Sequence, residues 1–203
     1  MPMSLTFVGN ALDIVALGFN EMIVGPIGLR PFVYHGVLGP VAVAPGVAAQ
    51  VIDAARALTR EFGLAGLCSL DFLLHDETIE VLEINPRPPA SVGLYAAPGQ
   101  PGADGPIAAH VRACRDGLLP APLPAPAGLC GVQTVFAPAA LTVDAARAAR
   151  LADRADCHDL PQPGAVFERG DPLCSVATSG ADPTQVRERL GAAREAVFAS
   201  MEF

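Results

Sequence analysis

The sequence predicts an α+β fold: an antiparallel sheet with flanking helices, followed by a small C-terminal α+β unit. Three observations lead to this fold class. Short apolar runs alternate with turn residues over the first forty positions, which is typical of antiparallel strands. A helical repeat of apolar residues follows over 46–62. A second pair of short apolar runs then precedes a proline-rich stretch and further mixed elements.

The first part of the chain contains four predicted strands and one predicted helix. The strands are expected over residues 5–8, 14–17, 22–24 and 31–34, with turns at Gly9-Asn10, Gly25-Pro26 and Gly36. The helix over 46–62 is expected to bury Val47, Val51, Ala54, Leu58 and Phe62, which share one face at helical spacing. Gly63 then stands where a glycine normally ends a helix.

Two further strands, 68–74 and 79–84, are joined by a polar loop and predict a hairpin. Beyond it we expect a Gly/Pro loop over 98–107 and a short helix over 107–114. Residues 120–126 contain four prolines, which favours a semi-rigid linker. We therefore predict two domains, 1–119 and 120–203.

The second domain is expected to contain strands 131–136, 165–168 and 173–177, with helices 144–154 and 183–199. The last helix has the clearest ends, with Asp182 as N-cap, Pro183 in its first turn and Gln185 completing a capping-box-like pattern. Its predicted core stripe is Val186, Leu190, Ala193 and Val197.

Composition excludes several classes of protein. The chain has 203 residues and a formal net charge of −8, and its 13 cationic residues are all arginine. No basic stripe is available to neutralise nucleic-acid phosphates. Asp13 and Glu21 interrupt the most apolar stretch, so no membrane span is expected. Five widely spaced cysteines without a CxxC pair indicate reduced thiols, and we expect a cytoplasmic protein.

The predicted hairpin carries the residues with chemical meaning. With a loop at 76–78, His75 would face Ile79, Leu73 would face Val81, and Asp71 would face Glu83. Two facing carboxylates repel each other at roughly 5 Å unless a cation lies between them. Asn85 follows Glu83 on the same face, and carboxylate and amide oxygens are ligands that Mg²⁺ prefers. Arg87 offers a bidentate fork to a phosphate or acyl-phosphate. The alternative is an exposed hairpin face with ordinary acids.

The string Glu-Ile-Asn-Pro-Arg over 83–87, with an acid twelve residues before it in an apolar strand, resembles the metal site of the ATP-grasp superfamily. The resemblance is specific over 63–92 and looser elsewhere, and it implies the C-terminal lobe of an ATP-grasp fold with a small C-terminal unit like that of biotin carboxylase. It also implies an ATP-dependent ligase that joins a carboxylate to an amine through an acyl-phosphate. Asp71, Glu83 and Asn85 would bind Mg²⁺ or Mn²⁺, and Arg87 would steady the phosphoryl group or the intermediate.

The sequence also departs from that family. The first lobe of such enzymes brings a glycine-rich loop and lysines to ATP, whereas this chain has no lysine and begins where the second lobe's sheet would begin. We therefore expect the metal-binding half of an ATP-grasp ligase: a truncated reading frame, a degenerate copy, or one piece of a split enzyme whose missing lobe comes from a partner chain or a homo-oligomer. The alternative is a non-catalytic remnant or interaction module. No acid follows Arg87 in Pro88-Pro89-Ala90-Ser91, which favours amide-type ligation over bicarbonate-dependent carboxylation.

Several other polar residues have two interpretations. His35 is a structural histidine or a substrate contact. Arg30 either solvates a strand end or meets an anionic substrate. His110 is structural or lies at an acceptor pocket, and His75 is expected to be solvated. The run Cys157-His158-Asp159 is contiguous, so its side chains point in different directions and do not indicate catalysis.

Overall fold

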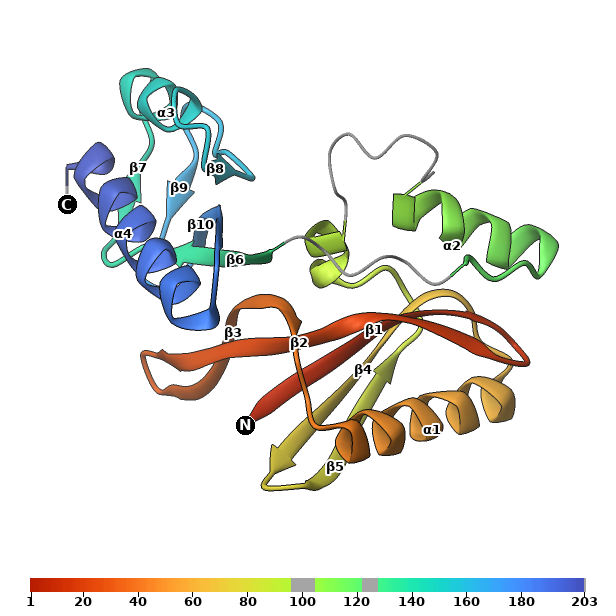
Figure 1. Ribbon diagram of the computed structural model, residues 1–203. Helices are drawn as coiled ribbons and strands as arrows, with labels where there is room; N and C mark the ends of the chain where they lie inside the picture. Colours follow the sequence, from red (N-terminus) through yellow and green to blue (C-terminus); the bar gives the residue numbers. More distant parts are fainter. Residues whose placement is uncertain (96–104, 122–127, 203) are drawn as a thin grey trace. The chain divides into compact units, whose positions relative to one another are not determined.

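The computed structural model describes residues 1–95, 105–121 and 128–202, and the chain forms two compact units (Figure 1). Unit 1 contains Met1–Met22 and Gly39–Ala127, and unit 2 contains Ile23–Leu38 and Gly128–Phe203. The units therefore differ from the predicted segments 1–119 and 120–203, because the tip of an early hairpin groups with the C-terminal residues. Each unit is described separately below.

Unit 1 is an antiparallel sheet in the order β5-β4-β1-β2 with helices beside it. Its elements are β1 (Pro2–Asn10), the first part of β2 (Ile14–Ile27), the end of β3 (Arg30–Val41), α1 (Pro45–Phe62), β4 (Ala65–His75), β5 (Thr78–Asn85), the 3₁₀ helix η1 (Ala90–Tyr95) and α2 (Gly105–Asp116). Strand β1 lies in the middle because it pairs with both β2 and β4. This arrangement confirms the predicted α+β class.

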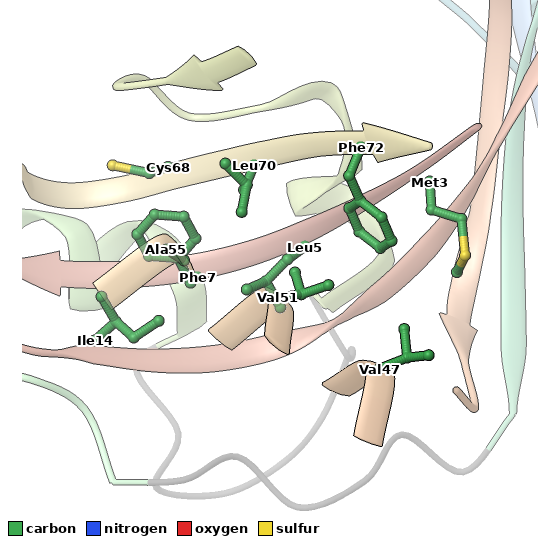
Figure 2. Packing of buried hydrophobic residues seen from close by; sticks show 10 residues of the cluster. All are labelled: Met3, Leu5, Phe7, Ile14, Val47, Val51, Ala55, Cys68, Leu70 and Phe72. Carbon is green, nitrogen blue, oxygen red and sulfur yellow. The ribbon is translucent and has the colours of Figure 1, made fainter. Parts of the chain in front are cut away.

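One face of this sheet carries the apolar core of the unit. Side chains alternate along a strand, so every second residue of β1 and β4 points to the same face. That face is closed by α1, which buries Val47, Val51 and Ala55 against it (Figure 2). The buried cluster consists of Met3, Leu5, Phe7, Ile14, Val47, Val51, Ala55, Cys68, Leu70 and Phe72. Burying side chains of this size stabilises the unit by roughly 1.5–3 kcal/mol each.

The opposite face of β1 carries buried polar side chains instead. Asn20, with no exposed surface, donates through Nδ2 to the Thr6 hydroxyl at 3.0 Å and to the Ser4 hydroxyl at 3.3 Å. Its Oδ1 accepts from the Tyr95 hydroxyl at 2.6 Å, which ties η1 to the sheet. Thr6 and Ser91 share a further hydroxyl hydrogen bond at 2.7 Å. A buried polar group is tolerated when it is hydrogen-bonded, and here each of these groups has a partner.

Unit 2 is an α+β unit in which the strands β3-β6-β10-β8 are hydrogen-bonded neighbours in that order and β7-β9 form a small two-stranded sheet. Its own elements are β6 (Leu129–Phe136), β7 (Leu141–Thr142), α3 (Ala145–Ala152), β8 (Cys157–His158), β9 (Val166–Phe167), β10 (Pro172–Gly180) and α4 (Pro183–Met201). The predicted start of α4 is confirmed: Asp182 accepts from Gln185 N at 2.9 Å, and Gln185 Oε1 accepts from Ala181 N at 2.9 Å. The helix ends at Met201, two residues beyond its predicted end. The predicted stripe of α4 is also buried.

The strand predictions for residues 14–41 were partly wrong. The runs 14–17 and 22–24 belong to one long strand, β2, and Gly25-Pro26 lies within it rather than in a turn. The turn is at Gly28-Leu29, where Gly28 adopts a φ of +59° that favours glycine. Gly36 lies inside β3, where a Cβ would collide with the Val132 carbonyl oxygen of β6. Glycine is needed there for a close approach between strands.

The helix prediction for 46–62 was correct in its bounds and partly wrong in its buried face. Gly63 ends α1 in the left-handed conformation as expected, with φ +61°. The buried residues advance in steps of four to Ala55 and Thr59, while Ala54 and Leu58 pack only partly against the core. Phe62 keeps 63% of its surface exposed, which contradicts its predicted burial.

Two predicted segments lie largely outside the described residues: the loop 98–107, except for the start of α2 at Gly105, and the linker 120–126, except for its first two residues. Among the helices that the structure describes, none is both long and apolar enough to cross a membrane.

On the polar face of unit 1, Gly18 lies against Tyr95 with no space for a larger side chain. A Cβ on Gly18 would lie 2.7 Å from the Tyr95 hydroxyl oxygen and 2.9 Å from Pro40 Cβ. We expect Gly18→Ala to lower the free energy of unfolding by about 1–3 kcal/mol, because it displaces the Tyr95 ring from Asn20. Urea denaturation measures the loss. The matched control is Gly46→Ala in α1, where a Cβ meets nothing within 4 Å and stability should hold or rise. Equal effects of both substitutions would contradict this account.

Candidate functional site

The hairpin of β4 and β5 brings the predicted acids together. Asp71 is the register partner of Glu83, and Ser69 is the partner of Asn85. Because β1 pairs Ser4 with Asp71 and Thr6 with Ser69, these residues lie on the polar face of unit 1, opposite the apolar core. The predicted facing pair of carboxylates is therefore present, at the edge of the sheet formed by β5.

The register of the strands between the turn and this pair differs from the predicted register. The turn contains two residues, Asp76 and Glu77, so His75 pairs with Thr78 rather than Ile79. Likewise Leu73 pairs with Glu80 rather than Val81. A bulge between Asp71 and Phe72 then shifts the register by one residue and restores the Asp71–Glu83 pair. The expected register at the hairpin tip was thus wrong by one residue, although the expected acid pair was correct.

The two carboxylates have different surroundings. Asp71 is half-buried, whereas Glu83 is exposed. Burial, together with the charge of Glu83, raises the pKa of Asp71 to about 6, although a hydrogen bond from Ser69 and the charge of Arg87 act in the opposite direction. Asn85 Nδ2 donates to Glu83 Oε1 at 3.0 Å and to Asp71 Oδ2 at 3.3 Å. One amide therefore links two carboxylates without neutralising their charge.

Arg87 follows the end of β5, and its side chain is exposed. Its charge lowers the pKa of Asp71, but by less than the other causes change that pKa. The guanidinium thus contributes little to holding the acid pair and remains accessible to a ligand. This placement is compatible with the predicted role of Arg87 toward a phosphoryl group.

The donor set suits a hard divalent cation. Asp71 and Glu83 provide carboxylate oxygens on one face, with the Asn85 amide beside them, and Mg²⁺ takes oxygen ligands while keeping positions for water and phosphate. The half-buried negative charge on Asp71 also favours a cation, since isolated buried charge is costly. Within the described ranges, no group of three or more His, Cys, Asp or Glu residues is arranged to hold a metal. The candidate site therefore depends on two acids and an amide.

The remaining predicted alternatives resolve in different ways. His110 Nδ1 accepts from the Leu67 backbone N–H at 2.9 Å, which gives it a structural role in joining α2 to β4. His75 is exposed at the hairpin tip, as expected. Sequence reasoning missed Ser69, whose hydroxyl contacts Asp71. Its spacing of two residues from Asp71 could have revealed it, since residues i and i+2 of a strand share a face.

The fold and this site define an α+β domain whose antiparallel sheet has an apolar face covered by a helix and a polar face that carries paired carboxylates. Comparison with known proteins finds a family model that matches the part of the chain that carries this site. Residues 1–91 match the family model described as "ATP-grasp domain". This match agrees, over that segment, with the resemblance to the ATP-grasp superfamily found in the sequence.

Curated relatives match over short segments. The large chain of carbamoyl phosphate synthase from Myxococcus xanthus (strain DK1622) is 31% identical over 83 residues, which cover 37% of this chain and 8% of that protein. The corresponding protein of Kocuria rhizophila is 41% identical over 51 residues, which cover 25% of this chain and 5% of that one. This chain therefore spans a small part of the curated relatives that it matches.

Solved structures match over nearly the whole chain and share the fold. The N5-carboxyaminoimidazole synthase of Aspergillus clavatus, in complex with ADP, has a TM-score of 0.65 and 17% identity, over 97% of this chain and 51% of that one. The L-amino acid ligase of Bacillus licheniformis has a TM-score of 0.70 and 11% identity, over 96% and 50%. The chain thus spans about half the length of these structures.

The facing carboxylates should destabilise the metal-free protein. We expect Asp71→Asn to raise the free energy of unfolding by about 1 kcal/mol at pH 7.5 in EDTA, because it removes a half-buried charge and its repulsion with Glu83. In thermal denaturation this corresponds to roughly 2–4 °C. The control is Glu77→Gln at the exposed hairpin tip, which should change stability by less than about 0.5 kcal/mol. A clear loss of stability in Asp71→Asn would contradict the electrostatic argument.

Proposed function

We propose that this chain supplies the metal- and phosphate-binding part of an ATP- and Mg²⁺-dependent carboxylate–amine ligase. The observation that carries the proposal is the Asp71–Glu83 pair with Asn85 beside it, within the segment that matches the ATP-grasp domain. The curated and solved relatives include a carbamoyl phosphate synthase and an L-amino acid ligase, which supports ligase chemistry.

The proposed roles of the site residues follow from their charge and position. Asp71, Glu83 and Asn85 would hold the cation through oxygen ligands, with Glu83 accessible enough to bridge two ions. When bound, the cation would neutralise charge on the phosphates of ATP. Asn85 would keep the two acids in place, because its amide already contacts both. Ser69 would orient Asp71 by its hydroxyl hydrogen bond.

Arg87 would act on the transferred group. Its exposed guanidinium can form two parallel hydrogen bonds to phosphoryl or acyl-phosphate oxygens. In the proposed reaction a substrate carboxylate attacks the γ-phosphorus of ATP, the bond to ADP breaks, and an acyl-phosphate forms. An amine then attacks the acyl carbon and phosphate leaves, so the products are an amide, ADP and phosphate. Positively charged side chains stabilise such transition states by positioning and electrostatics.

The sequence around and beyond Arg87 bears on the substrates and on the source of the ATP-binding lobe. The segment Pro88-Pro89-Ala90-Ser91 after Arg87 contains no acid, which favours an amine acceptor over bicarbonate-derived carboxylation. All 13 cationic residues of the chain are arginine, so the lysines that typically contact ATP in this superfamily would come from another polypeptide segment or partner.

The same absence of lysine favours a second candidate function. A module that keeps the fold for interaction, without nucleotide turnover, would need neither lysine nor a cation. This candidate predicts that the acid pair binds divalent cations no better than exposed acids elsewhere on the chain.

Metal binding tests the proposal on the chain alone. We expect Mn²⁺, followed by electron paramagnetic resonance, to bind at a saturable site, and Glu83→Gln to weaken its affinity at least tenfold because one charged ligand is lost. The matched control is Glu80→Gln on the same strand, which pairs with Leu73 and not with Asp71. The control should bind Mn²⁺ like the unaltered chain. Equal affinities in all three proteins would favour the interaction module.

Turnover tests the reaction. The intact protein from its native cells, with any co-purifying chain, should release ADP and phosphate when given its carboxylate and amine. Glu83→Gln should lower kcat by about 10²–10³, since charge stabilisation at the phosphoryl group is lost while the fold is kept. Unchanged turnover in this variant would overturn the assignment of the site.

A further inference from the structure

Unit 2 contains a hollow of about 650 Å³ that the proposed metal site does not use. This volume lies within the roughly 300–1,000 Å³ typical of small-molecule sites. Four parts of the unit line it: the β2–β3 turn, the end of β6, the loop before β10 and the helix α4. None of its lining residues comes from the hairpin that carries Asp71 and Glu83.

The lining is strongly cationic in a chain whose net charge is −8. Arg30, Arg169 and Arg194 come from three different elements, and no aspartate or glutamate is among the lining residues. Arg194 is partly neutralised by its neighbour Glu195, whose Oε1 lies 2.9 Å from Arg194 Nη2. Three of 13 cationic residues thus gather around one hollow, where a positive potential attracts anions.

Two of these arginines have no carboxylate of their own. Across residues 1–95, 105–121 and 128–202, Arg30 and Arg169 take part in no ion pair or side-chain hydrogen bond. Most other arginines of the chain bond an acid or a carbonyl, such as Arg56 with Asp13 at 2.8 Å and Arg189 with the Ser179 carbonyl. The guanidinium forks of Arg30 and Arg169 therefore remain available for an incoming anion.

His35 adds a buried polar atom to the same lining. Its Nε2 is inaccessible to solvent and has no hydrogen-bond partner in the structure, while its ring packs against Phe136 with centroids 5.0 Å apart. A buried polar atom without a partner is uncommon. Because this atom is closed off from solvent, the His35 ring shapes the lining beside Phe136 and offers no polar contact to an anion near Arg30, which lies five residues earlier in β3.

Apolar groups complete the lining and give it shape. Ile27, Phe136 and Phe198 border the hollow together with the charged groups. At its edge, Gly170 has a φ of +89° and a Cβ there would lie 2.8 Å from Ile27 Cγ2, so the backbone next to Arg169 approaches the β2–β3 hairpin closely. A lining with cationic and apolar parts suits an organic anion better than a bare ion.

We propose that this hollow is a binding site for a small organic anion, in which Arg30 and Arg169 bind a phosphate or carboxylate group and the apolar lining receives the rest of the molecule. The site goes beyond the proposed ligase function, because it requires neither ATP nor a metal ion. For Arg30 it favours the contact with an anionic substrate over the solvated strand end, the two alternatives that the sequence left open.

Nuclear magnetic resonance of the ¹⁵N-labelled full chain tests this site. The probes are phenyl phosphate, benzoate and inorganic phosphate, titrated in EDTA without nucleotide, and the backbone amides of Gly28, Arg169 and Gly170 are the reporters. We expect saturable shifts of these amides with at least one of the two aromatic anions, which identifies the preferred acid group. That anion should bind more tightly than inorganic phosphate, because only it reaches the apolar lining.

Charge-matched variants separate a built site from general attraction. Arg30→Gln and Arg169→Gln should each weaken binding about tenfold, because each removes a charged hydrogen-bond donor. Arg194→Gln should have a smaller effect, since Glu195 already engages that side chain. The control is Arg115→Gln, which changes the net charge equally, lies outside the lining and is paired with Asp116. The spectra themselves report whether each variant is folded.

Two results would overturn the proposal: no saturable shift at the three reporter amides with any probe, or equal weakening in Arg169→Gln and Arg115→Gln. The same titration on Glu83→Gln keeps this test independent of the ligase assignment. If Glu83→Gln still binds the anion, the anion site is supported. This holds even if the unaltered chain and Glu83→Gln bind Mn²⁺ equally and the metal site is thereby rejected.

Discussion

Asn20 is the residue on which the polar face of unit 1 depends. Its amide is fully buried and connects β2 with β1 through Ser4 and Thr6, and with η1 through Tyr95. Without these bonds a sheet apolar on one face would have to leave polar groups buried and unpaired on the other, at about 1–3 kcal/mol for each group. Because these hydrogen bonds satisfy the buried polar groups, β1 can lie at the centre of the unit with an apolar face toward α1 and a hydrogen-bonded polar face on the other side. The paired carboxylates lie on that polar face, so the candidate site depends on the same hydrogen-bond network.

Asp71 and Glu83 form a candidate site that lowers the stability of the fold that carries it. Asp71 is drawn toward its neutral form by burial and by Glu83, and only an amide, a hydroxyl and a distant guanidinium oppose this. A sheet built for stability alone would place an apolar or β-branched residue at Asp71. The proposed cation accounts for the conflict, since a positive charge between the acids would convert repulsion into binding. Unit 2 contains the reverse situation, in which Arg30 and Arg169 form no ion pair with any acid among the described residues.

The sequence predicted the elements whose local chemistry is explicit and failed where tertiary contacts decide. Asp182, Pro183 and Gln185 fix the start of α4 by hydrogen bonds within one turn of helix, so the pattern was sufficient. Gly36 was expected in a turn, but it serves the packing of β6 against β3, which local sequence does not reveal. The acid pair was predicted because a short motif encodes it. Arg30 was offered as a contact for an anionic substrate, but the hollow as a whole was not predicted, because its arginines are far apart in the sequence and only the fold brings them together.

The bulge beside Asp71 has a consequence for how this hairpin tolerates change. Between the turn and the bulge the strands pair in one register, and beyond the bulge they pair in another, offset by a single residue. Removing one residue from β5 would therefore cost little in backbone hydrogen bonds, since the strands would remain paired. It would also keep Glu83 opposite Asp71, because the residue removed is the extra one that the bulge accommodates. An added residue in the same stretch would instead turn Glu83 to the other face while the strands stay paired, because successive side chains point to opposite faces. Homologous hairpins that are longer here are therefore expected to lose the acid pair before they lose the fold.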